Sequence, residues 1–162
     1  MISDALGMFA DATSLTALSG TSIMIAPNTI DLVAARDVGR GQPVYVAFNI
    51  TTTVSAAALT QMEFAVAVAT TENLLTNTQV ITKYGPVRYE QLTAGTCFKL
   101  AIGSLGEIGL DAGSPAYRRY LGVGVFNVAS SVVSAGAFSA RLTLDPGEGP
   151  TAPLYGSGFT VL

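Results

Sequence analysis

Histidine and tryptophan are both absent from the 162-residue sequence, and only 12% of its residues are charged. Histidine is the commonest general acid/base and the commonest metal ligand, so we expect neither an enzyme nor a cofactor or metal site. Soluble domains are usually about a quarter charged. Yet 49% of this chain is apolar, and its mean hydropathy is +0.48. A surface so poor in charge indicates a subunit that lies against other protein.

A basic excess is also missing, because 11 acidic residues face 8 basic ones and the net charge is −3. Direct binding to nucleic acid is therefore not expected. Residues 1–35 hold Asp4, Asp11 and Asp31 and no base, so this part either lies on a basic partner or is a solvated tail. The single cysteine, Cys97, excludes an intrachain disulfide, and we expect it to be a small strand residue.

Two windows without any charge, residues 41–62 and 120–140, are long enough to be considered as membrane spans. Polar and turn residues interrupt both windows, and both alternate in the manner of β-strands. The N-terminus has neither a basic region nor a continuous apolar run of the kind that signal peptides contain. We therefore expect no contact with a membrane and no signal peptide.

Apolar residues alternate with small or polar ones along much of the chain, which predicts about eight β-strands. The clearest example is residues 44–51, where one face holds Val44, Val46, Phe48 and Ile50. The other candidates are residues 62–69, 98–102, 121–126 and 138–144, with shorter ones near Ile23, near Val80 and at the C-terminus. Little helix is expected between them. The pattern predicts an all-β fold, an antiparallel sandwich or jelly roll.

The second faces of two of these strands are small rather than charged, with Ala65, Ala67 and Ala69 in one and Gly122 and Gly124 in the other. Such faces suit close contact with a neighbouring subunit. They equally suit an inner face that packs against another part of the same chain. The sequence leaves both interpretations open.

The first 20 residues have apolar side chains at irregular spacing, so we predict a docking arm at residues 1–20 and a β jelly-roll domain at residues 21–162. The arm would place its apolar side chains in pockets on a neighbour and its two carboxylates against basic groups. The residues expected to make these contacts are Ile2, Asp4, Leu6, Met8, Phe9, Asp11 and Leu15. Removing the arm should leave a folded β domain.

Two further segments are candidates for subunit contacts. Arg36, Asp37 and Arg40 lie in a glycine-rich turn, which is either solvated with a local ion pair or touches a partner. Arg118 and Arg119 are either solvated at a strand entry or bridge to acids of a neighbouring subunit. The glycine-rich stretches near residues 103 and 122 lack a following helix, so they do not predict nucleotide binding.

Three stretches, IDLVAARDVGRGQPVYV, FAVAVATTENLLTNTQVIT and LYGSGFTV, together resemble the capsid cement (decoration) proteins of short-tailed bacteriophages. The resemblance implies a jelly roll that sits as an oligomer on the outer capsid and clamps adjacent major capsid subunits, with no catalytic residues. The expected partners are the major capsid protein and the chain itself, as a homodimer or alternatively a trimer. A jelly-roll module that binds a glycan or receptor on a phage fibre is the alternative, although the lack of tryptophan disfavours a sugar-stacking platform.

Overall fold

The structure is a computed structural model, and it describes residues 7–19, 22–32, 44–57, 59–103, 118–129 and 131–143. These residues form nine β-strands and a short 3₁₀ helix, η2 (Tyr89–Gln91). The strands are β1 (Met8–Ser14), β2 (Ile23–Ile25), β3 (Ile30–Asp31), β4 (Val44–Ala56), β5 (Gln61–Ala69), β6 (Gln79–Arg88), β7 (Cys97–Gly103), β8 (Tyr120–Asn127) and β9 (Val133–Thr143). None of the helices among these residues is long and apolar enough to cross a membrane.

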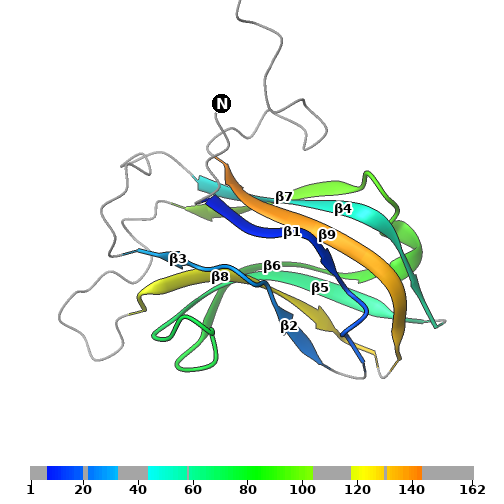
Figure 1. The fold of residues 1–162 in the computed structure, drawn as a ribbon, viewed down its shortest axis with the longest axis horizontal. Helices are drawn as coiled ribbons and strands as arrows, with labels where there is room; N and C mark the ends of the chain where they lie inside the picture. The colour runs from blue at the N-terminus through cyan, green and yellow to red at the C-terminus, as the bar shows by residue number, and fades with distance from the viewer. Residues whose placement is uncertain are drawn as a thin grey trace, which may run out of the picture.

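The strands form two antiparallel sheets that pack face to face (Figure 1). One sheet has four strands in the order β1-β9-β4-β7. The other has the order β2-β8-β5-β6, and β3 pairs with β8 beside β2. The predicted all-β, antiparallel architecture is confirmed.

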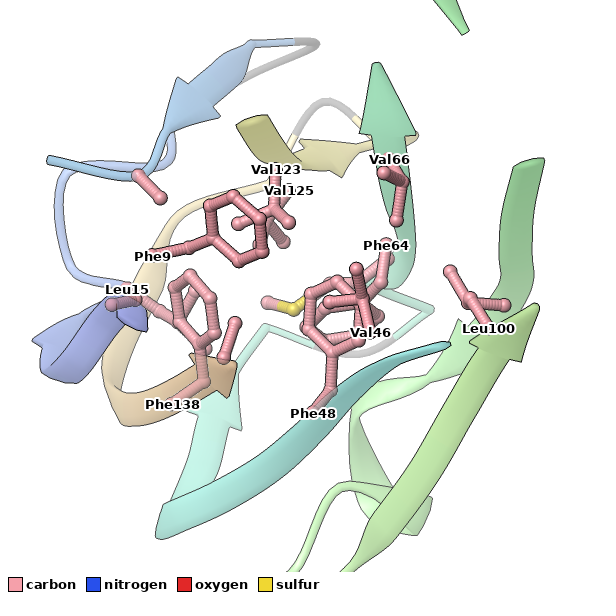
Figure 2. Close-up of a cluster of buried hydrophobic side chains, with 14 of the residues drawn as sticks. Phe9, Leu15, Val46, Phe48, Phe64, Val66, Leu100, Val123, Val125 and Phe138 are labelled. Atoms are coloured by element: carbon pink, nitrogen blue, oxygen red, sulfur yellow. The ribbon is translucent and has the colours of Figure 1, made fainter. Parts of the chain in front are cut away.

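The core lies between the sheets and consists of the inward faces that alternation predicted. The β4 residues Val44, Val46, Phe48 and Ile50 are all fully buried, as are Met62, Phe64 and Val66 of β5. Figure 2 shows Phe48 and Phe64 among the aliphatic side chains of both sheets. The two ring centroids lie 5.6 Å apart in an edge-on arrangement. Fully burying one such side chain contributes about 1.5–3 kcal/mol, so this core can hold the fold without disulfides.

The sandwich has two ends with different connections. At one end, β1 and β4 begin and β9 ends, since Met8 pairs with Arg141 and Tyr45 pairs with Thr143. We call it the Met8 end. At the opposite end lie the described residues of four turns: 15–19 and 22, 57 and 59–60, 92–96, and 128–129 with 131–132. We call this the Leu59 end.

The predicted docking arm at residues 1–20 is wrong for the part that the structure describes. Residues 8–14 form β1, an edge strand that pairs with β9. The side chains of Phe9 and Leu15 are fully buried in the chain's own core, where Figure 2 shows both beside Phe138. These two side chains therefore cannot fill pockets on a neighbour, and the domain begins before residue 21.

Candidate functional site

The small outer face of the five-stranded sheet is covered in part by the chain itself. Leu74, in the β5–β6 connection, is 4% exposed and lies over Gly122 of β8. A Cβ atom placed on Gly122 would meet Leu74 Cδ1 at 2.4 Å and Thr29 Cγ2 at 3.0 Å. Of the two interpretations of these small residues, packing within the chain therefore accounts for Gly122.

Hydrogen bonds hold this connection, residues 70–78, in one shape. Thr70 N donates to Thr76 O at 3.2 Å, Leu74 N donates to Thr71 O at 3.0 Å, and Leu75 N donates to Asn73 Oδ1 at 3.1 Å. The neighbouring Leu75 side chain is 69% exposed. The loop thus buries one leucine against the sheet and presents the next one to solvent.

The arginine pair predicted at residues 118 and 119 is engaged within the chain. Arg119 Nε donates to Asp31 Oδ1 at 2.8 Å, and the guanidinium lies 5.2 Å from the centre of the Tyr120 ring. Arg118 Nε donates to the carbonyl oxygen of Asn77 at 3.0 Å. The Asp31–Arg119 ion pair joins β3 to the start of β8 near the Met8 end, so Arg119 already has an acidic partner in its own chain.

Cys97 lies half-buried at the start of β7, as expected for a small strand residue. Its Sγ is 3.2 Å from Asn49 Oδ1 and 3.0 Å from the Gly95 carbonyl oxygen. Burial raises the pKa of the thiol, and the nearby Arg141 opposes this only in part. A raised pKa leaves less thiolate at neutral pH, which is the opposite of what a nucleophile needs. In the described part of the chain, no three Cys, Asp or Glu side chains gather in a way that could hold a metal ion.

The Leu59 end presents apolar side chains from two adjacent turns. Leu59 is 73% exposed, Val132 59% and Val128 44%. The turns are joined through Thr60, which is fully buried and whose hydroxyl forms a hydrogen bond with the Ser131 hydroxyl. This end is therefore a defined apolar surface on a folded support.

The chain matches the model of a known protein family. The Bbp16 family model matches residues 9–142, which run from the second residue of β1 to the next-to-last residue of β9. The chain belongs to the Bbp16 family. No curated protein matches the chain in sequence. The matched part of this Bbp16-family chain contains the whole two-sheet core, so both ends of the sandwich belong to the family's domain.

The other predicted contact residues of this Bbp16-family chain are divided between described and undescribed parts. Ile2, Asp4, Leu6, Arg36, Asp37 and Arg40 lie outside the described residues. Met8 is half-buried at the start of β1, and exposed Asp11 accepts a hydrogen bond from the Ser139 hydroxyl at 3.4 Å. Residues 1–6 and 33–43 connect to strands that meet at the Met8 end.

The Leu59 end is not among the sites predicted from the sequence. Its signal was present in the two uncharged windows, residues 41–62 and 120–140, which were weighed only as membrane spans. In the structure these windows contain the two adjacent turns with Leu59, Val128 and Val132. An uncharged stretch that alternates as a strand but has large apolar residues in its turn is the pattern that would have predicted this surface.

Proposed function

We propose that this chain is a structural virion protein that binds the outer surface of a phage capsid and cements adjacent major capsid subunits. The observation that carries the proposal is the order of the strands, which agrees with the fold implied by the sequence resemblance. The low charge of the chain, with 12% charged residues, adds support, because much of such a surface suits burial against other protein.

The strand order supports a jelly roll. When β2 and β3 are counted as one interrupted strand, the pairs β5·β6, β4·β7, β2/β3·β8 and β1·β9 are nested one within the next. This nesting results when one long antiparallel hairpin is rolled into two facing sheets. Jelly rolls of eight strands are common in viral capsid proteins and lectins. The fold is thus consistent with a virion protein and, by itself, also with a glycan-binding module.

The Met8 end is the proposed contact with the capsid. The candidate residues Ile2, Asp4 and Leu6 precede β1 in the chain, and Arg36, Asp37 and Arg40 lie between β3 and β4, so both segments join the sandwich at this end. The acidic and apolar residues before β1 suit basic and apolar groups on the major capsid protein. This retains the arm hypothesis for residues 1–6 alone.

The protein is further proposed to act without catalysis or a cofactor and to self-associate, as a homodimer or alternatively a trimer. Closed symmetry is the usual arrangement of small identical subunits. A cement protein gains from it because several weak contacts with the shell act together.

Cosedimentation with purified expanded phage heads that lack this protein tests the proposal. We expect the purified chain to pellet with the heads in saturable amounts and to raise the temperature at which the heads break open. Failure to bind heads, combined with specific binding on a glycan array, would overturn the proposal in favour of the fibre module.

A further inference from the structure

The Leu59 end carries apolar side chains that the fold of a single chain does not need. Seven large apolar side chains are exposed among the described residues, and three of them, Leu59, Val128 and Val132, lie in the two adjacent turns of this end. Single exposed apolar residues are normal on a protein surface. A group of three on neighbouring turns marks a contact surface.

Neither the backbone conformation at position 59 nor burial within the chain explains why this residue is a leucine. Its φ of 69° lies in the left-handed region, where glycine, asparagine and aspartate are favoured. The side chain is 73% exposed, so its removal from the isolated chain would lose little packing. A strained and exposed leucine is accounted for when the side chain becomes buried against a partner.

The two turns are held in place before any partner arrives. The Thr60 hydroxyl donates to the Ala57 carbonyl oxygen at 2.6 Å, and Asn127 Nδ2 donates to the Ser131 carbonyl oxygen at 2.7 Å. Val128 N donates to the Gln61 carbonyl oxygen at 2.9 Å, which ties one turn to the strand that follows the other. Because the apolar surface is preorganised, little conformational entropy is lost when it is buried.

The turns at this end lack charge, and this indicates which partner binds there. The four turns at residues 15–22, 57–60, 92–96 and 128–132 contain no charged residue. Exposed charges border these turns: Arg88 pairs with Gln61 beside the 57–60 turn, and Glu90 lies in η2, just before the 92–96 turn. At a two-fold axis each side chain lies close to its own copy, so a charge there would meet a like charge. A surface without charge avoids this repulsion, and an apolar centre with charged residues outside it is typical of a self-association interface.

We propose that a second copy of this chain docks on the Leu59 end about a two-fold axis, with Leu59, Val128 and Val132 at the centre of the interface. This inference rests on the proposed self-association and adds the surface that makes it. It also has a consequence for the cement function. Because the Met8 ends lie opposite the Leu59 ends, such a dimer has two Met8 ends at its far poles and can hold two capsid subunits at once.

The Leu59→Asn substitution separates association from folding. Asparagine tolerates the left-handed backbone, so at protein concentrations low enough to keep both chains monomeric the variant should unfold at the same denaturant concentration as the wild type or a higher one. We expect sedimentation equilibrium to give the wild type a mass of twice 16.6 kDa and to show L59N dissociating about tenfold or more readily. Leu75→Asn is the matched control, because Leu75 is 69% exposed on the β5–β6 connection, outside the Leu59 end.

Two outcomes overturn the inference. One is a wild-type chain that remains monomeric at every concentration tested. The other is a dimer that L75N weakens and L59N does not. Head binding is measured separately on the same samples, so a monomeric chain that still decorates heads refutes the interface and leaves the proposed cement function standing.

Discussion

At the scale of single residues, Gly122 shows how the sheet's outer face accommodates the chain's own loop. Glycine leaves the space that Leu74 Cδ1 occupies, and this contact holds the β5–β6 connection against β8. Gly124, two residues further along the same strand and face, has no such neighbour, since a Cβ there would meet its nearest atoms at 3.5 Å. The two glycines therefore have different structural roles, although the sequence pattern presents them as equivalent.

This difference predicts opposite effects for the same substitution. Gly122→Ala should lower the free energy of unfolding by about 1–3 kcal/mol, because Leu74 and Thr29 must both move. Gly124→Ala should be neutral or stabilising by about 0.4–1 kcal/mol, because the unfolded chain loses freedom and the folded strand has room. Urea unfolding of the two variants checks this. Equal losses at both positions would show that Leu74 does not depend on Gly122.

The thiol of Cys97 provides a second test at this scale. Burial raises its pKa, so at pH 8 the folded protein should react with iodoacetamide several times more slowly than the same chain unfolded in urea. Mass spectrometry of the alkylated chain follows both rates. Because the folded pKa is raised, the stability contributed by the neutral thiol is present below the unfolded pKa and is lost as pH rises through the folded value. Equal alkylation rates in the two states would contradict the burial.

At the scale of elements, residues 44–51 of β4, together with β5 and β8, were predictable because apolar residues recur there at every second position. In β4 the four predicted inward residues are all buried, and the same holds for Leu121, Val123 and Val125 of β8. Apolar residues at every second position indicate a strand with one face toward a core. The pairing of the strands was not predictable, because alternation identifies faces and not neighbours.

β1 was not predicted as a strand, because apolar and polar residues do not alternate regularly along it. Its register against β9 shifts between Met8 and Ala10 and again between Ala10 and Thr13, and Ala12 has a φ of 42°. Each shift inserts a residue that moves the following side chains to the other face. Phe9 and Ala10 are therefore both buried, a combination that a regular strand does not produce. These bulges account for the irregular spacing of apolar residues that suggested an arm.

Two truncations distinguish the strand from the remaining arm. Deleting residues 2–6 should leave the unfolding transition unchanged and reduce binding to heads. Deleting residues 2–20 should unfold the domain, because it removes β1 together with the buried side chains of Phe9, Leu15 and Leu18. Loss of one large buried side chain alone costs about 2–5 kcal/mol, which is a large part of the stability of a small domain. Circular dichroism and thermal unfolding provide the measurement, and a cooperative transition in the longer truncation would restore the arm hypothesis.

At the scale of the whole molecule, each end of the sandwich has a different proposed function. The candidate capsid contacts connect at the Met8 end, and the uncharged apolar surface lies at the Leu59 end. This division could not be predicted from the sequence. It depends on which turns lie at the same end of the sandwich, and that follows from the order of the strands. The 128–132 turn and the 57–60 turn are more than 60 residues apart in the chain, yet Thr60 and Ser131 are hydrogen-bonded.

The dimeric clamp has a consequence for the strength of decoration. When two linked sites bind one surface, the second binding event is intramolecular, and the apparent affinity rises by about 10²–10⁴ without any new contact. Leu59→Asn leaves the Met8 end unchanged, so each monomer retains its own contact with the capsid. The variant should therefore still bind expanded heads but require about a hundredfold or more higher concentration for half-occupancy, as cosedimentation titration measures. L75N should match the wild type. Equal half-occupancy for L59N and the wild type would mean that the two copies do not hold the capsid together.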